Sequence, residues 1–244
     1  MHWFLKPILF ENPRRDQSSV FVERSWLYTE ISSHLTENGG VIISGASGTG
    51  KTDAIWQIVD NSCFSQRNSI EEYQSNLERL SRQVVAYHFC QVDDVLTCRV
   101  ANMVHSIAAQ MTQSPSLEAY KQLLSMDQKL RSKLSLSNCE ADPDTAFIDG
   151  ILLPLKHLQE ETTIENGIKF ILIDAICESQ MKRQSYSDSI ITFLAKHSDS
   201  FPSWLKLVIS IRTENISLLK EFRYVIIRYS YKIDFHILYR NFPF

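Results

Sequence analysis

The stretch G-A-S-G-T-G-K-T, Gly45 to Thr52, decides the fold of this chain. It matches the pattern G-x-x-x-x-G-K-[ST] at every fixed position. The apolar run Val41–Ile43 before it is typical of a buried strand, and Asp53–Asn61 after it carries apolar residues at helical spacing. Five of the seven glycines fall in this region, at positions 39, 40, 45, 48 and 50. The sequence therefore predicts a strand, a sharply bent loop and a helix in succession.

A loop of this kind binds phosphate groups. Its successive backbone N–H groups and the N-terminus of the following helix form a cradle for a polyphosphate. Lys51 is expected to reach the β- and γ-phosphates, and the Thr52 hydroxyl to ligate Mg²⁺. The candidate nucleotide-binding residues are Gly45, Ala46, Ser47, Gly48, Thr49, Gly50, Lys51 and Thr52. An ordinary glycine-rich turn that binds nothing is the structural alternative.

Composition narrows the class of protein. A chain of 244 residues has room for one large α/β domain. The net charge of −3 gives no basic stripe, which argues against a nucleic-acid partner. No apolar run approaches the roughly 20 residues of a membrane-spanning helix. The five cysteines are scattered and odd in number, which is typical of free thiols in a reducing compartment, and their spacing to nearby histidines is not that of a zinc site.

Periodicity predicts further elements around the loop. Helices are expected over 21–35, 100–111, 116–136, 146–158 (capped by Asp144 or Thr145) and 187–196, with a surface helix or insertion over 68–81. Strands are expected over 84–89, 168–174, 205–211 and 224–229. Strands that alternate with helices at these intervals predict an α/β fold with a doubly wound, mostly parallel sheet flanked by helices.

Two charged residues end strands of this sheet, Asp174 and Arg212. Ligands of such sheets bind beyond the carboxyl ends of the strands, where the loop also lies. Asp174 is expected to bind Mg²⁺, usually through water, opposite Thr52. Glu178 and Arg212 are the candidate catalytic residues: Glu178 would polarise an attacking water, and Arg212 would sense the γ-phosphate or stabilise transition-state charge. The alternatives are a turn-capping aspartate, an exposed loop acid and a solvated arginine.

Three segments resemble the nucleotide-binding region of TANC-family proteins. They are HFCQVDDVLTC (88–98), FILIDAICES (170–179) and FPSWLKLVISIRT (201–213), and the similarity runs from about Phe21 to Phe222. The resemblance implies a STAND-class P-loop NTPase domain of AAA-like build within an ankyrin- and tetratricopeptide-repeat scaffold. It implies ATP/ADP and Mg²⁺ as ligands, and a role as a regulatory switch or assembly element. It also implies protein partners through scaffold assembly and a cytoplasmic location, at cortical or postsynaptic sites.

Residue by residue, the resemblance marks the same site. Asp174 and Glu178 match the outer positions of the second acidic motif of STAND proteins, and Cys177 stands where many relatives have a second aspartate. At most slow ATP hydrolysis is therefore expected. Arg212 matches the strand-end arginine motif. The tetrapeptide 21–24 resembles the F-x-G-R motif whose backbone lies against the adenine, with glutamate in place of glycine.

Composition and the extent of the resemblance together suggest a division of the chain. Residues 1–18 are expected to form a leader, 19–222 the P-loop domain and 223–244 a divergent tail. In STAND proteins a lid segment follows the core, and ankyrin repeats would lie further downstream, so a fragment or an improvised ending is expected. The sequence leaves the oligomeric state open.

Three other functions compete with this one. A P-loop kinase of a small molecule would use Lys129, Arg131 and Lys133 as an anion-gripping lid. A GTPase would carry D-x-x-G at the second acidic strand and N-K-x-D further on, and neither motif fits, so adenine is preferred. A degenerate domain that supports protein contacts without nucleotide is the third alternative.

Overall fold

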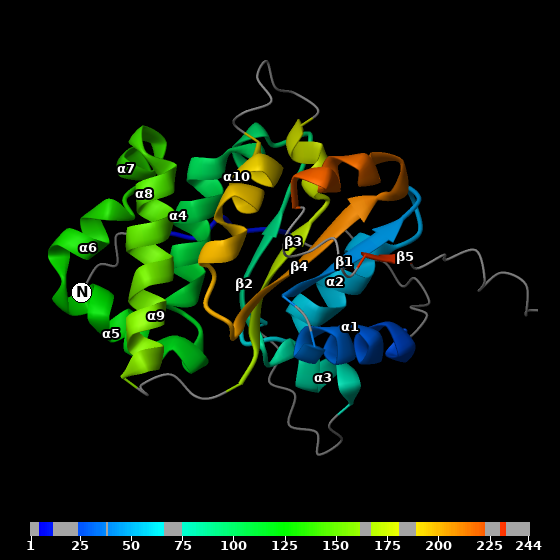
Figure 1. Ribbon diagram of the computed structural model, residues 1–244, viewed down its shortest axis with the longest axis horizontal. Helices are drawn as coiled ribbons and strands as arrows, with labels where there is room; N and C mark the ends of the chain where they lie inside the picture. Colours follow the sequence, from blue (N-terminus) through cyan, green and yellow to red (C-terminus); the bar gives the residue numbers. More distant parts are fainter. Residues whose placement is uncertain are drawn as a thin grey trace, which may run out of the picture.

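A parallel β-sheet forms the centre of the molecule (Figure 1). The computed structural model describes residues 5–11, 24–37, 39–65, 75–161, 167–180, 189–222 and 230–232. The strand order is β2-β3-β4-β1-β5, and every pairing is parallel. The strands are β1 (Gly40–Gly45), β2 (Val84–Phe89), β3 (Lys169–Asp174), β4 (Leu205–Arg212) and β5 (Ser230–Lys232). The predicted α/β class with a parallel sheet flanked by helices is confirmed.

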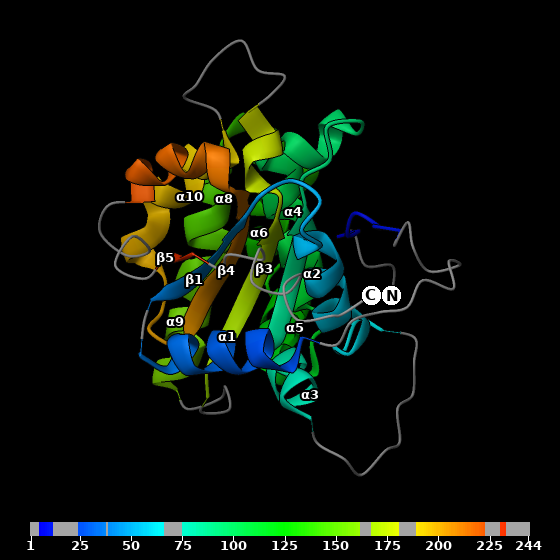
Figure 2. The same cartoon turned by 90° about the vertical axis from the view of Figure 1, so that its right-hand side faces the viewer.

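Helices cover both faces of the sheet (Figures 1 and 2). On one face lie α1 (Ser25–Glu37), α2 (Lys51–Asp60) and α3 (Asn76–Ser81). On the other lie α4 (Val100–Met111), α5 (Glu118–Met126), α6 (Gln128–Lys133), α7 (Leu136–Ala141), α8 (Pro143–Phe147), α9 (Leu153–Glu160) and α10 (Ile190–His197). The strands are apolar along most of their length because side chains pack on both faces.

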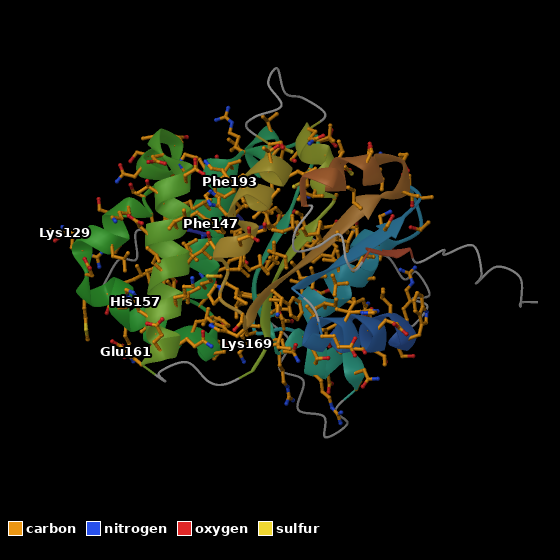
Figure 3. The ribbon with its side chains drawn as sticks, in the orientation of Figure 1. Lys129, Phe147, His157, Glu161, Lys169 and Phe193 are labelled. Atoms are coloured by element: carbon orange, nitrogen blue, oxygen red, sulfur yellow. The ribbon has the colours of Figure 1, made fainter. Side chains whose placement is uncertain are left out.

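Alternate residues of one strand contribute to two separate cores. Phe170 and Leu172 of β3 pack with the layer of α1 and α2, whereas Ile171 and Ile173 pack with the layer of α4 and α10. This alternation follows from the two-residue side-chain period of a strand. In the second layer, Phe147 of α8 and Phe193 of α10 meet edge to face, with ring centroids 5.2 Å apart (Figure 3). The sheet is therefore fixed from both sides.

Several expected elements have different bounds. The helix predicted over 116–136 is broken, because Asp127 has extended backbone angles and its side chain accepts a hydrogen bond from the Leu130 N–H. The helix predicted over 146–158 begins earlier, at Pro143, and its N-cap is Asp142 rather than Asp144 or Thr145. In both cases the helix boundary is set by an aspartate side chain that caps the first turn, and hydrophobic periodicity does not reveal such a cap.

A π-helical turn, Ile148–Leu152, joins α8 to α9. Pro154 has no N–H to donate to the preceding turn, which leaves a carbonyl there without its helical partner. The Tyr120 hydroxyl donates to the Gly150 carbonyl at 2.7 Å instead. The long predicted helix thus continues through this region, but with a wider turn that periodicity does not reveal.

The described parts of the two ends contact the core. Within the expected leader, Leu5 is buried and the Ile8 N–H donates to Ser106 Oγ of α4 at 3.0 Å. The strand expected over 224–229 lies outside the described residues, and β5 follows it as a short partner of β1. The remaining short segments are 3₁₀-helical: η1 (Val95–Cys98), η2 (Pro115–Leu117), η4 (Ile176–Gln180), η6 (Ser198–Ser200) and η7 (Thr213–Phe222).

Candidate functional site

The loop Gly45–Thr52 joins the carboxyl end of β1 to the first turn of α2. Gly48 and Gly50 have φ angles of 77° and 80°, in the left-handed region that favours glycine. Gly50 is the N-cap of α2, so the helix begins directly at Lys51. The loop therefore bends back on itself and brings the N-terminus of α2 to the carboxyl edge of the sheet.

Lys51 is folded against its own loop. Its Nζ donates to the carbonyl oxygens of Gly45 at 2.7 Å and Ala46 at 2.8 Å, and the residue is only 8% exposed. Burial lowers the pKa of the Lys51 ammonium, while the nearby Asp174 carboxylate raises it. The Lys51 ammonium is thus hydrogen-bonded to neutral carbonyl oxygens of its own loop. An anionic group could take the place of these carbonyls as its partner.

Thr52 and Asp174 meet across the site. Thr52 Oγ1 donates to Asp174 Oδ2 at 2.7 Å, although the two residues are 122 positions apart in sequence. Asp174 is the last residue of β3 and is 2% exposed. The sequence placed these two oxygen-bearing residues opposite each other, and the structure brings them into direct contact.

The Asp174 carboxylate has a second partner that sequence reasoning missed. Ser210 of β4 donates from its hydroxyl to Asp174 Oδ1, and this serine is completely buried. Burial raises the pKa of Asp174, and the hydrogen bonds from Ser210 and Thr52 oppose that rise. A lone serine in the apolar run L-K-L-V-I-S-I-R was the one available signal, because a buried hydroxyl needs a partner.

Glu178 and Arg212 form an ion pair. Arg212 Nη2 donates to Glu178 Oε1 at 2.9 Å, and the Val92 N–H donates to the other carboxylate oxygen at 3.2 Å. The side chains are 18% and 31% exposed, respectively. The two candidate catalytic residues are therefore engaged with each other. Val92, on the turn after β2, is a second partner that the sequence did not indicate.

A cavity lies beside these residues at the carboxyl edge of the sheet. It has a volume of about 170 Å³. Its walls are Ser47, Gly48, Gly50, Lys51, Thr52, Asp53, Ala175, Glu178, Ser210 and Arg212. The loop after β1, the first turn of α2, the segment after β3 and the end of β4 thus contribute to a single site, because these three strands are neighbours in the sheet (Figure 2). The expected convergence at this edge is what the topology of a parallel sheet produces.

Comparison with protein families gives one match over this region. The family model described as Nephrocystin 3, N-terminal, matches residues 21–212 of the 244. The chain belongs to the nephrocystin 3 N-terminal family. The matched residues include the whole loop and extend to Arg212. The match is not to TANC proteins, so the narrower resemblance to that family is not supported.

In this nephrocystin 3 N-terminal domain, Arg24 reaches the Gly45–Thr52 loop from outside. Its guanidinium donates to the Gly50 carbonyl at 2.6 Å and to the Thr49 carbonyl at 3.3 Å. A Cβ atom on Gly50 would lie 2.5 Å from Arg24 Nη2, so only glycine fits here without a shift of the arginine. Residues 21–23 of the expected adenine-contacting motif lie outside the described residues.

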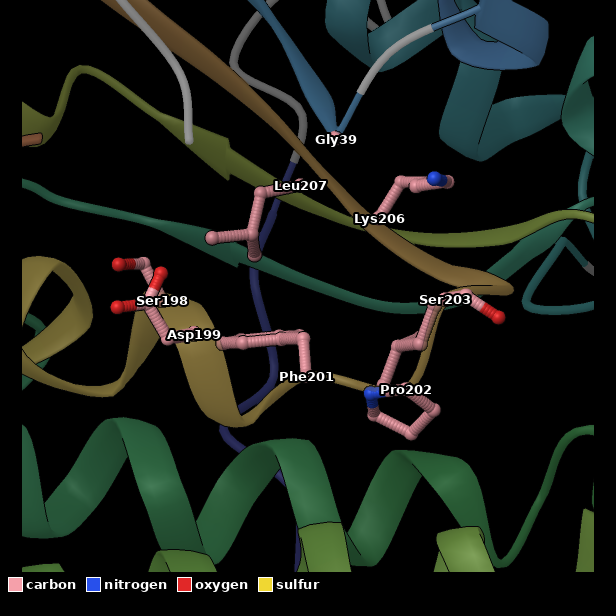
Figure 4. A pocket seen from close by; sticks show the side chains of 9 residues that line it. Gly39, Ser198, Asp199, Phe201, Pro202, Ser203, Lys206 and Leu207 are labelled. Atoms are coloured by element: carbon pink, nitrogen blue, oxygen red, sulfur yellow. The ribbon is translucent and has the colours of Figure 1, made fainter. Parts of the chain in front are cut away.

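A larger cavity, of about 300 Å³, lies at the opposite edge of the sheet near the start of β4. Figure 4 shows the Lys206 side chain on the other side of the β4 ribbon from Phe201 and Pro202. The polar groups around this cavity therefore do not converge on a common point, and no chemistry is assigned to it. Both cavities have charged side chains in their walls, which are Asp199 and Lys206 in the larger one.

The basic residues of α6 lie far from the loop. Helix α6 is at the end of the domain opposite α2 and β1 (Figure 1), and Lys129 lies at this outer end (Figure 3). Lys133 pairs with Asp149 at 2.7 Å. The placement of this helix does not support a kinase lid built from Lys129, Arg131 and Lys133. No helix in the part of the chain that the structure describes is long and apolar enough to cross a membrane.

Proposed function

We propose that this domain binds ATP and ADP together with Mg²⁺, as a STAND-type P-loop domain. The observation that carries the proposal is the hydrogen bond between Thr52 and Asp174, which lies next to Lys51 at the N-terminus of α2 and beside a polar cavity. This arrangement combines a cation, a hydroxyl and a carboxylate with a helix N-terminus, which together suit a metal-bound polyphosphate.

The residues fit the phosphates and the metal separately. The Lys51 ammonium has carbonyl partners that a phosphate oxygen would replace with a stronger, charge-assisted bond. Thr52 and Asp174 offer hard oxygen ligands of the kind that Mg²⁺ prefers. When bound, the metal would neutralise charge on the phosphate oxygens. The cavity is smaller than the roughly 300–1,000 Å³ of most small-molecule sites, so it suits the phosphates with the base lying outside it.

We propose that the bound nucleotide biases a conformational switch. The polar groups of the site are hydrogen-bonded to one another in three places: Lys51 to loop carbonyls, Thr52 to Asp174, and Arg212 to Glu178. A nucleotide would compete with the first two directly and with the third through its terminal phosphate. It can shift the equilibrium between arrangements only by its difference in affinity for them. ATP and ADP differ in the terminal phosphate, which is the group nearest to Arg212 in this proposal.

Hydrolysis is proposed to be slow at most. Glu178 must turn a carboxylate oxygen toward a water to orient it, but Arg212 and the Val92 N–H occupy its two oxygens. Turnover therefore requires a rearrangement before the chemistry. Regulation of a larger ankyrin-repeat scaffold that engages protein partners is the finer form of the proposal. The five free thiols support an intracellular setting.

Thermal unfolding with and without Mg·ATP and Mg·ADP tests the proposal. A ligand at about a hundred times its dissociation constant stabilises a fold by roughly 2.7 kcal/mol, which is a shift of about 5 to 11 °C for a domain of this size. We expect this shift in the parent and its loss in Lys51→Ala. Lys121→Ala, on the exposed surface of α5, is the matched control and should respond like the parent.

The opposite result would identify a different kind of domain. If the parent unfolds cooperatively but neither nucleotide shifts its midpoint, the chain is a degenerate domain that supports protein contacts without a nucleotide. A shift that persists in Lys51→Ala would place binding elsewhere than at the loop.

A further inference from the structure

Ser210 occupies the point where β3 and β4 reach the site. It is completely buried and follows Ile209, which pairs with Ile173 in the parallel register. Its Oγ accepts a hydrogen bond from the Ala175 N–H at 2.8 Å. The same hydroxyl is also hydrogen-bonded to Asp174 Oδ1. Because an amide N–H can only donate and a serine hydroxyl has one proton, that proton belongs to the bond with Asp174.

These two bonds fix the direction of the Asp174 carboxylate. With Oδ1 held by Ser210, the other oxygen, Oδ2, is turned toward Thr52 on the loop. The bond from Ala175 also holds the backbone behind the carboxylate, where φ is 51° in a residue other than glycine. This conformation is uncommon and persists only when surrounding contacts support it. One hydroxyl thus anchors both the side chain and the turn that carries it.

We infer that Ser210 is a positioning residue for the Mg²⁺ site. By holding Oδ1, it keeps Oδ2 of Asp174 beside the Thr52 hydroxyl, so that both oxygens face one metal. A group that orients a metal ligand from behind contributes to affinity for the metal without touching it. The inference rests on the proposed function, and it concerns the metal rather than the phosphates, which the loop and Lys51 would bind.

The experiment must measure the contribution of the metal to nucleotide binding separately from that of the phosphates. ADP binding to the full chain is measured by calorimetry in Mg²⁺ and again in EDTA, and the ratio of the two dissociation constants gives the enhancement due to the metal. The variants are Ser210→Ala, which removes the donor, and Ser210→Thr, which restores a hydroxyl. The matched control is Ser44→Ala, a completely buried serine of β1 whose hydroxyl bonds to Thr213 Oγ1 at 3.2 Å.

We expect Ser210→Ala to lower the magnesium enhancement about tenfold, in keeping with the loss of one hydrogen bond to a charged group. Affinity in EDTA should stay within about twofold of the parent, Ser210→Thr should recover most of the enhancement, and Ser44→Ala should match the parent. If Ser210→Ala does not unfold cooperatively, Ser210→Cys replaces it, because it keeps the volume and donates weakly.

Three results would overturn the inference. An unchanged enhancement in Ser210→Ala shows that Asp174 needs no such anchor. Equal losses in Mg²⁺ and in EDTA show a general structural role. If the parent binds ADP with the same affinity in Mg²⁺ and in EDTA, Asp174 itself does not contribute to binding through a metal. If the parent binds no ADP at all, it is the proposed function that fails, and the Ser210 inference falls with it.

Discussion

Asp174 is a carboxyl group that the protein keeps almost completely out of water. At 2% exposure its ionised form loses hydration. Hydrogen bonds from the Ser210 and Thr52 hydroxyls and from the Ala175 backbone oppose that loss, together with the charge of the Lys51 ammonium. An apolar residue would be more stable at such a position than a buried charge. The residue is thus placed at some expense of stability, as is common for groups that serve a binding site.

Replacing Asp174 with asparagine should stabilise the fold at neutral pH. Burial raises the folded-state pKa of Asp174 above its ordinary value of 3.8, so its contribution to stability is fully present only below that value and is lost as the pH rises through the folded pKa. Asparagine has no such loss. The unfolding midpoint of Asp174→Asn, without nucleotide or metal, should therefore exceed that of the parent by more at pH 7 than at pH 4.

The matched control for this measurement is Asp93→Asn, an exposed residue on the turn after β2. Its difference from the parent should stay small at both pH values. A decrease in the midpoint of Asp174→Asn at pH 7 would mean that the charge itself stabilises the fold.

At the scale of the element, the loop between β1 and α2 depends on two left-handed glycines in different surroundings. Around Gly48, an added Cβ would have no atom within 4 Å among the described residues. At Gly50, the same atom would meet the Arg24 guanidinium. Both positions carry the same conformational strain for any other residue, but only one adds a steric clash.

Alanine at the two positions should separate these effects. Gly48→Ala is expected to cost about 1–2 kcal/mol, the strain of a left-handed residue with a Cβ. Gly50→Ala should cost more, because Arg24 must also give up its bonds to the loop carbonyls. Urea unfolding of both variants measures the difference. Adding Arg24→Ala should narrow the gap; equal costs in the two glycine variants would mean that Arg24 moves aside freely.

The sequence predicts well the elements that are defined by runs or regular spacing of apolar residues, and poorly the features that depend on a single contact. The strands β2, β3 and β4 were predicted within one residue of their bounds, because burial on both faces of the sheet leaves long apolar runs. The helix α4 was predicted as closely, from the helical spacing of its apolar residues. The break at Asp127 and the π turn before Pro154 were missed, because each depends on one side-chain bond. The Asp174–Ser210 pair depends on which strands become neighbours, and local patterns do not encode this.

At the scale of the whole molecule, one contact of the described N-terminal residues 5–11 with the sheet is made by an aromatic ring. Phe10 packs against Tyr87, His88 and Phe89 of β2, with ring centroids 5.9, 5.4 and 5.4 Å away. Among the residues that the structure describes, β2 has a neighbouring strand on one side only, so this contact covers an edge of the sheet. The neighbouring Leu9 side chain is 86% exposed.

These adjacent residues give a matched pair for testing that contact. Phe10→Ala should destabilise the fold by about 1–3 kcal/mol, less than a fully buried phenylalanine because the ring is only half-buried. Leu9→Ala should stay within about 0.5 kcal/mol of the parent. Chemical denaturation of the two variants under one set of conditions makes the comparison, and equal effects would show that the segment adds no packing energy.

The strand order has a consequence for the time course of synthesis. β1 is synthesised long before both of its neighbours in the sheet, β4 and β5. At about 5–20 residues per second, the ribosome needs on the order of ten to thirty seconds to progress from β1 to β4. Throughout that interval, six residues that are buried in the finished sheet have no strand beside them. A nascent chain of this design therefore depends on chaperones, or on early packing of α1 and α2 over β1, until β4 and β5 enclose that strand.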